Sequence, residues 1–403
     1  MKILVLSTEY PNPLTKFDTP VVHYYVRQWL IMGVDVKVIH LRSKFPLIYY
    51  LFARLALPVV KRIVKTDFVP TVFANRILRF KHEMVDVVSL PLKKYFPHTN
   101  FKERVVLKAV GQIKHECERN DFIPDFILGH FVSPQLQIIP VLKRVMGVEN
   151  ASLVLHEPLD SILAMYQNNA QKLFNSIDYI GFRFPEMQRV FENKIAIAGK
   201  AFICPSGVPS KYILEENFKV RKEVSVKICF VGMLIPLKNV DVLINAVSNK
   251  PFRKPFELFI AGEGLSQESL VTQVNDLGIS DSVKFLGRMS REDVQKLMHS
   301  CELFVMVSKP EAFGLVYLEA MAKGCLVVGS KGQGIDGVIV HGVNGFLCEP
   351  GNVKELFELL GYIDRLDAKK RDEIVQNALR TARDYSDEKV AQKYLKNLGI
   401  NYA

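Results

Sequence analysis

Residues 310–324 read Pro310-Glu-Ala-Phe-Gly-Leu-Val-Tyr-Leu-Glu-Ala-Met-Ala-Lys-Gly324 and lie between two apolar runs. The run before them covers residues 301–308, and the run after them covers residues 325–329. Short apolar runs of this length predict buried parallel strands. Residues 315–323 are mostly good helix formers, and Gly324 can end a helix in the left-handed conformation. The stretch therefore predicts a strand, loop, helix and strand of an α/β unit.

Two carboxylates in this stretch, Glu311 and Glu319, are separated by seven residues. Glu311 is expected in the loop after the first strand, where open α/β sheets bind their ligands. Glu319 is expected about one turn inside the helix and can point towards the same crevice. Backbone N–H groups at a helix start favour a phosphate. We therefore predict that Ala312, Phe313, Gly314 and Leu315 bind a phosphate-containing ligand, the donor substrate. A nucleotide-diphosphate sugar would fit, although an exposed glutamate is more often simply solvated.

The composition indicates a two-domain intracellular protein. A chain of 403 residues is too long for one ordinary core, and 49% of its residues are hydrophobic. Its six cysteines are scattered without close pairs, which indicates a reducing cytoplasm and neither a disulfide framework nor a zinc site. The first residues are too short and strand-like for a signal peptide, and no apolar run is long enough for a transmembrane helix.

Positive charge is concentrated in one segment. Residues 42–114 hold 15 Lys/Arg against 4 Asp/Glu, an excess that equals the net charge of +11 of the whole chain. Such a patch suits nucleic acid, an anionic lipid or a phosphorylated substrate. Within it, residues 45–64 are strongly apolar and aromatic, and three cations lie at their end: Lys61, Arg62 and Lys65. The apolar segment is either a helix buried in its domain or an interfacial segment that docks on an anionic membrane.

The stretch from Glu311 to Gly324 closely resembles the E-x7-E signature of the family-4 retaining glycosyltransferases, which have the GT-B fold. The resemblance is specific over residues 228–350 and weaker over residues 1–210. Strands and helices alternate twice along the chain, which predicts two Rossmann-like, doubly wound domains facing a cleft. We expect an acceptor-side domain at 1–210, a nucleotide-sugar domain at 211–384, and a last helix at 385–403 that returns to the first domain.

The resemblance also covers elements of the N-terminal half. Leu153-Val-Leu-His156-Glu-Pro-Leu-Asp160 is similar to a strand–His–x3–Asp element of the family, whose His lies beside the transferred sugar. His130 follows an earlier strand and is a second candidate, with a structural role as the alternative for both histidines. Thr19 stands in the first loop where the family usually has glycine, so a different acceptor geometry is expected there.

In the C-terminal half, Gly232 and Lys238 resemble the Gly-Arg-Leu…Lys-Gly element of the family, with Met233 in place of the usual Arg. The glycine lets backbone approach a ligand, and Lys238 offers a point charge for a diphosphate. Arg288 is a candidate for stacking on the base or hydrogen bonding to it. No spacing of metal ligands is recognised anywhere in the sequence, and the resemblance implies neither metal nor cofactor.

We therefore predict transfer of a hexose from a nucleotide sugar, with a UDP-sugar favoured and a GDP-sugar possible, to a saccharide or lipid-linked acceptor in surface polysaccharide synthesis. The catalytic candidates are Glu311, His156 and Lys238. The expected location is the cytoplasm, on the inner face of the membrane, without nucleic acid as a partner. A nucleotide-sugar epimerase of the same fold and a basic adaptor for membrane or nucleic acid remain the alternatives.

Overall fold

The computed structural model of the chain describes residues 1–14, 19–46, 76–95, 99–215 and 225–401. Lys61, Arg62 and Lys65, together with most of the apolar segment 45–64, lie outside these ranges. The chain divides into two compact units, one formed by residues 1–205 with 390–403 and the other by residues 206–389. The domain limits predicted from the sequence, 210 and 384, stay predictions.

The N-terminal unit is built on an eight-stranded sheet of order β3-β4-β2-β1-β5-β6-β7-β8. The strands are β1 (Lys2–Ser7), β2 (Asp35–Lys44), β3 (Leu78–His82), β4 (Val85–Lys93), β5 (Phe126–His130), β6 (Asn150–Val154), β7 (Tyr179–Phe182) and β8 (Lys200–Ile203). The helices are α1 (Val21–Ile31), α4 (Glu103–Glu118), α5 (Gln135–Met146), α6 (Leu159–Tyr166), α7 (Ala170–Phe174) and α8 (Pro185–Glu192). All strand pairs are parallel except β3 with β4.

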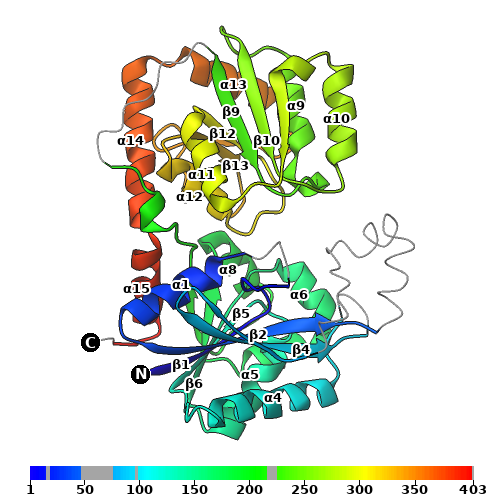
Figure 1. Ribbon diagram of the computed structural model, residues 1–403, viewed down its shortest axis with the longest axis vertical. Coiled ribbons are helices and arrows are strands. Elements are labelled where there is room, and N and C mark those ends of the chain that lie inside the picture. Colours follow the sequence, from blue (N-terminus) through cyan, green and yellow to red (C-terminus); the bar gives the residue numbers. More distant parts are fainter. Residues whose placement is uncertain (15–18, 47–75, 96–98, 216–224, 402–403) are drawn as a thin grey trace. The chain divides into compact units, whose positions relative to one another are not determined.

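The crossovers explain how the helices cover this sheet. The chain passes from β1 to β2 towards one edge and from β5 to β6 towards the other. Because parallel crossovers are right-handed, α1 and α5 must lie on opposite faces. Figure 1 shows this arrangement, with α4 and α5 together on one face and α1 on the other. Both faces are covered, which is why the central strands β1 and β5 are almost wholly buried.

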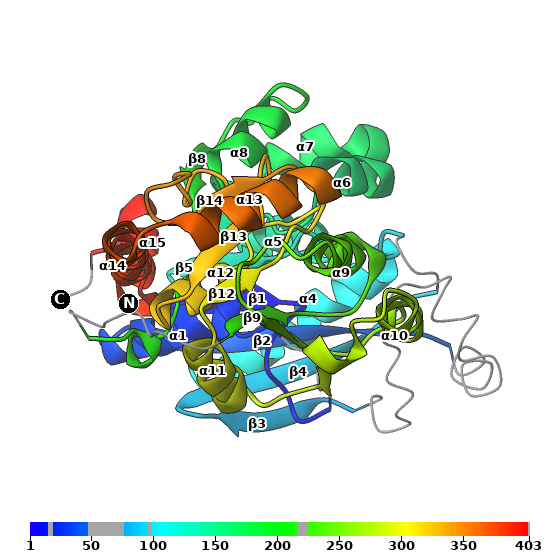
Figure 2. The same cartoon turned by 90° about the horizontal axis from the view of Figure 1, so that it is seen from above.

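The C-terminal unit contains a six-stranded, all-parallel sheet of order β11-β10-β9-β12-β13-β14. The strands are β9 (Val226–Val231), β10 (Phe256–Ala261), β11 (Val283–Gly287), β12 (Leu303–Val305), β13 (Leu326–Ser330) and β14 (Phe346–Cys348). The helices are α9 (Val240–Ser248), α10 (Gln267–Asp276), α11 (Arg291–Ser300), α12 (Leu315–Ala322), α13 (Val353–Arg365) and α14 (Ala368–Asp384). Figure 2 shows α9 and α10 on one side of β9, with α11 and α12 on the other.

The last helix, α15 (Asp387–Asn397), leaves the second unit and joins the first from Val390 onward. The Trp29 indole of α1 donates a hydrogen bond of 3.1 Å to the carbonyl oxygen of Ala391. The ring of Tyr394 packs edge-on against Trp29 and Tyr25, with centroids 5.2 and 5.4 Å apart. The predicted fold class, two Rossmann-like domains with a returning C-terminal helix, is therefore confirmed.

One predicted strand is shorter in the structure, and one hairpin was not predicted. The apolar run 301–308 forms only the three-residue strand β12, since its last residues already belong to the loop at the sheet edge. The hairpin of β3 and β4 was not predicted at all, because charged residues alternate along the exposed edge strand β3 and give the segment a merely basic character. Among the described residues, no helix is both long and apolar enough to cross a lipid bilayer.

Candidate active site

The strand order of the C-terminal unit brings two distant loops together. The sheet extends from β9 towards β11 in one direction and from β12 towards β14 in the other, so β9 and β12 flank the point where the direction reverses. Open α/β sheets bind ligands in the crevice beyond the carboxyl ends of such a strand pair. Lys238 follows β9 and Glu311 follows β12. Hydrogen bonds join the two loops, from Lys309 N to Leu237 O at 2.8 Å and from Asn239 Nδ2 to Val307 O at 2.7 Å.

Lys238 and Glu311 form an ion pair at this position, with 2.5 Å between Nζ and Oε2. Their side chains are only 18% and 12% exposed, so the pair is partly shielded from water. The hydroxyl of Ser308 donates a second hydrogen bond of 3.1 Å to the same carboxylate oxygen. The backbone N–H of Glu311 donates to Oε1 of Gln333 at 3.0 Å, which fixes the loop. A buried or half-buried ion pair of this kind holds both charged groups in place for a ligand.

Helix α12 begins directly beside this pair. Gly314 caps the helix in the left-handed conformation, with φ +74°. A Cβ atom here would lie 2.4 Å from the ring of Tyr317, whose hydroxyl donates to Met306 O at 2.6 Å. Glycine is thus needed both for the backbone angle and for the close approach. The helix start presents N–H groups of Gly314 and Leu315 without helical partners, as an anion site requires.

Around Gly314 the donor-binding candidates are packed closely. Phe313 is buried, whereas Ala312 and Leu315 are half-buried. A Cβ atom on Gly334 would lie 2.1 Å from the carbonyl oxygen of Ala312, so the loop of residues 331–337 lies against the loop that carries Glu311. Ser308 and Gln333, which hold Glu311, were not predicted. Their only signal in the sequence is that Ser308 ends an apolar run and Gln333 lies in a glycine-rich loop.

Glu319 lies in α12 and is 7% exposed. Its Oε1 lies 3.6 Å from Nη1 of Arg291, the first residue of α11. Burial raises the pKa of the Glu319 carboxyl, and the Arg291 guanidinium offsets this only in part. A carboxylate kept in such surroundings is costly unless a ligand uses it.

The remaining donor candidates follow other strands of the sheet. Gly232 directly follows β9, and a Cβ atom on the neighbouring Gly262 would lie 1.8 Å from the carbonyl oxygen of Gly232. Met233 is 47% exposed, where the family usually has a cation. Arg288 is exposed and follows β11 at the edge of the sheet, two strands away from β9. At about 4.8 Å per strand, this corresponds to about 10 Å, a span that a nucleotide can bridge.

In the N-terminal unit, the structure brings His130 and His156 together. Nδ1 of His130 lies 3.2 Å from Nε2 of His156, at the carboxyl ends of the neighbouring strands β5 and β6. The ring of Phe131 stacks on His156 with 4.1 Å between centroids. Burial, with Arg183 nearby, lowers the pKa of His130 to about 3 and the pKa of His156 well below its usual value. Both imidazoles are therefore neutral at pH 7.

Two further groups complete this end of the N-terminal sheet. The Glu157 carboxylate accepts hydrogen bonds from the backbone N–H groups of Val132 and His156, which hold the β5 and β6 loops together. Burial raises the pKa of Glu157. Thr19 Oγ1 accepts a hydrogen bond of 3.4 Å from Val21 N at the start of α1. The observed role of Thr19 is thus at the helix start.

Comparison with known proteins agrees with this architecture. Residues 214–381 match the family model of group 1 glycosyl transferases. A similar sequence is an uncharacterized glycosyltransferase, MJ1178, from Methanocaldococcus jannaschii, with 28% identity over 66% of this chain and 72% of the relative. N-acetyl-alpha-D-glucosaminyl L-malate synthase from Bacillus anthracis is 31% identical over 39% of this chain and 41% of that protein.

The similarity to solved structures extends over the whole chain. The crystal structure of Anabaena Alr3699/HepE in complex with UDP and glucose has a TM-score of 0.67 and 21% identity, and the match covers 99% of both chains. At this level of identity, the likeness shows the shared fold alone. The class defined at this point is that of the GT-B fold: two Rossmann-like units, of which the C-terminal one matches the group 1 glycosyl transferase model over residues 214–381.

Proposed function

We propose that the protein is a family-4 retaining glycosyltransferase that moves a hexose from a nucleotide-diphosphate sugar to a saccharide or lipid-linked acceptor. The observation that carries this proposal is the Lys238–Glu311 ion pair, which lies where β9 and β12 diverge and beside the start of α12. A cation, a carboxylate and a set of free N–H groups in one place match the diphosphate and the sugar hydroxyls of such a donor.

The site exchanges partners when the donor binds. The Lys238 ammonium and the N–H groups of Gly314 and Leu315 then bind the diphosphate. The Glu311 carboxylate, released from Lys238 but still held by Ser308, then accepts hydrogen bonds from the sugar hydroxyls. The Lys238 ammonium and the two N–H dipoles lie in place before the reaction and stabilise the negative charge that develops on the departing diphosphate. Met233 supplies no charge, so the helix start contributes the neutralisation that a second cation would provide.

The bond between the anomeric carbon and the phosphate oxygen breaks, and its electron pair goes to the nucleoside diphosphate. The acceptor hydroxyl attacks from the same face and passes its proton to the departing phosphate oxygen, so the configuration at the anomeric carbon is retained. Glu319 binds the ribose hydroxyls, Arg288 the base, and Gly232 the diphosphate through its backbone. The neutral imidazole of His156 donates to or accepts from a hydroxyl of the transferred sugar. No protein residue needs to form a covalent intermediate.

A UDP-sugar is the favoured donor and a GDP-sugar the second choice. The support is the structural likeness to a protein whose crystals contain UDP and glucose. On the acceptor side we place Thr19 and His130, and we propose a membrane-proximal acceptor in surface polysaccharide synthesis because of the basic, aromatic segment 45–65. Transferase function is favoured over an epimerase or a basic adaptor, because the matched family model describes glycosyl transferases.

The test begins with a thermal-shift screen of UDP, GDP and ADP and of their hexoses, since a ligand that binds the folded state raises its melting temperature. The sugar nucleotide that stabilises the protein most is then incubated with saccharide and lipid-linked acceptors. Proton NMR of the product reports the anomeric configuration. An inverted product would refute the retaining mechanism, and interconversion of the sugar nucleotide without an acceptor would favour the epimerase.

A further inference from the structure

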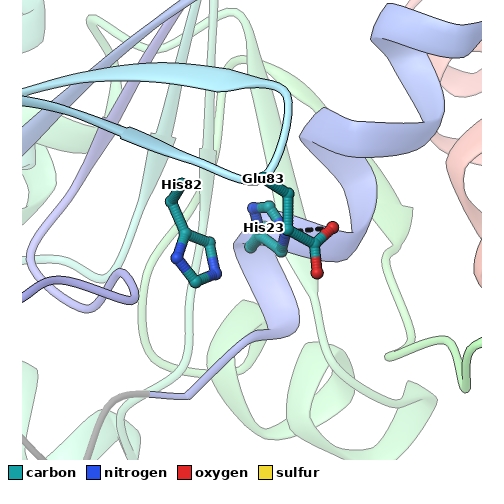
Figure 3. A group of neighbouring side chains, drawn as sticks. All are labelled: His23, His82 and Glu83. Carbon is teal, nitrogen blue, oxygen red and sulfur yellow. Dashed lines mark ion pairs between the residues drawn. The ribbon is translucent and has the colours of Figure 1, made fainter.

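Three side chains outside the donor site converge in the N-terminal unit. His23 lies in the first turn of α1, His82 is the last residue of β3, and Glu83 begins the turn that leads to β4. One ligand atom from each, two ring nitrogens and a carboxylate oxygen, lie within 4.8 Å of one another. Figure 3 shows the ring of His23 rising from the helix towards the hairpin turn, where the two other side chains meet it. In the described part of the chain, this is the only such group of three potential metal ligands.

The Nε2 atom of His23 is the central observation. His23 is 1% exposed, and its Nε2 lies 3.2 Å from Oε2 of Glu83. This contact is an ion pair only, and Nε2 has no hydrogen-bond partner among the described residues. A buried polar atom without a hydrogen bond is costly, and a cation bound beside it would satisfy its lone pair.

The opposite nitrogen of His23 is held in place. The hydroxyl of the buried Tyr10 lies 3.0 Å from Nδ1. Metal-ligating imidazoles usually make a hydrogen bond through their second nitrogen, which fixes both tautomer and ring orientation. Here Nδ1–H would donate to the Tyr10 oxygen and leave Nε2 for the metal.

We propose that His23, His82 and Glu83 form a zinc site that ties the β3–β4 hairpin to α1. Two imidazoles and one carboxylate are a ligand set that Zn²⁺ accepts, with water as the fourth ligand. Zinc bonds of about 2.0–2.2 Å place tetrahedral ligand atoms about 3.3 Å apart. The distance of 3.2 Å between His23 and Glu83 already meets this separation, whereas the half-buried His82 would have to move its ring nitrogen closer, since the group as a whole lies within 4.8 Å.

One neighbour opposes the metal. Nη1 of Arg27, one turn further along α1, lies 3.4 Å from the same oxygen of Glu83. The guanidinium therefore shares the carboxylate and repels a dication. Removing this charge should therefore raise the affinity for zinc, so Arg27→Gln should tighten zinc binding. The alternative is that Tyr10, His23 and Glu83 form only a structural contact, and then removal of Arg27 should have no effect on metal binding.

The test uses the full-length, tag-free protein, stripped with EDTA and titrated with Zn²⁺ against a chromophoric chelator. We expect about one ion per chain, and Co²⁺ should give the visible absorption of a four-coordinate site. His82→Ala and Glu83→Gln remove ligands at an exposed turn and should each weaken binding at least about tenfold. Tyr10→Phe removes only the supporting hydroxyl and should weaken it about 10–100-fold.

The matched control is His115→Ala, which removes an exposed histidine on α4 and should leave binding unchanged. Circular dichroism establishes that each variant is folded. Absence of stoichiometric binding by the parent would overturn the proposal. Equal binding by the parent and by the folded His82→Ala variant would also overturn it, because the ion would then lie elsewhere. Binding that is lost with either ligand but kept in the control supports it.

Discussion

Replacing Glu319 by Gln should weaken binding of UDP and at the same time stabilise the protein. The variant keeps the size of the side chain but removes the charged acceptor that we assign to the ribose hydroxyls. Hydrogen bonds to a charged group contribute about 1.5–3 kcal/mol. Their loss therefore corresponds to a dissociation constant for UDP that is about 10–150-fold higher. Isothermal titration calorimetry with UDP measures this directly.

The stability effect follows from the surroundings of the carboxyl. Burial raises the pKa of Glu319 above its ordinary value of 4.5, so the folded protein holds this proton more tightly than the unfolded chain does. The group's contribution to stability is greatest below pH 4.5 and is lost as the pH rises through the folded-state pKa. At pH 7 the buried, ionised carboxylate of Glu319 therefore lowers the free energy of unfolding of the parent, and the neutral Gln side chain avoids this loss. We expect a higher melting temperature for the variant, and a smaller difference between the two proteins at acidic pH.

Glu292→Gln serves as the control, because Glu292 is an exposed carboxylate beside Arg291 at the start of α11. It should change neither UDP binding nor melting temperature appreciably. The reasoning is refuted if the folded Glu319→Gln variant binds UDP within about twofold of the parent. A lower melting temperature would show instead that the ion pair with Arg291, 3.6 Å away, outweighs the cost of burial.

Three further outcomes are expected. Glu311→Gln should leave UDP affinity within a few fold of the parent but lower kcat about 10–150-fold, because we assign its carboxylate to the sugar hydroxyls. An unchanged kcat in a transfer assay would contradict this role. Sugar transfer should need no added Mg²⁺ or Mn²⁺, and the His82→Ala variant should retain transferase activity. A metal requirement would be shown by loss of the initial rate when EDTA is added and its recovery on adding Mg²⁺. The protein should float with anionic vesicles at low salt and be released at high salt. A variant with Lys61, Arg62 and Lys65 changed to Glu should not bind the vesicles but should still bind UDP. Equal flotation of both proteins would point to a different docking surface.

The local structure of the C-terminal unit was largely predictable. The predicted helix over residues 315–323 is α12, Leu315–Ala322, and the apolar run 325–329 forms β13, Leu326–Ser330. Gly324 ends α12 with φ +77°, as expected from its place after a run of helix formers. These features depend on side chains close in sequence, so periodicity and turn residues indicate them. The hairpin β3–β4 escaped prediction because an edge strand with one exposed face has no continuous apolar run.

Local sequence patterns indicate the alternation of strands and helices, the glycines at their ends, and the pair of glutamates that we propose for the donor site. Which residues meet depends on the tertiary fold. It joined Lys238 to Glu311, placed Arg291 beside Glu319, and brought His82 and Glu83 to His23. The physical reason is that strand order and crossover direction set these contacts. Both depend on how whole faces of the sheets are buried, and no local pattern around any one of these residues encodes that.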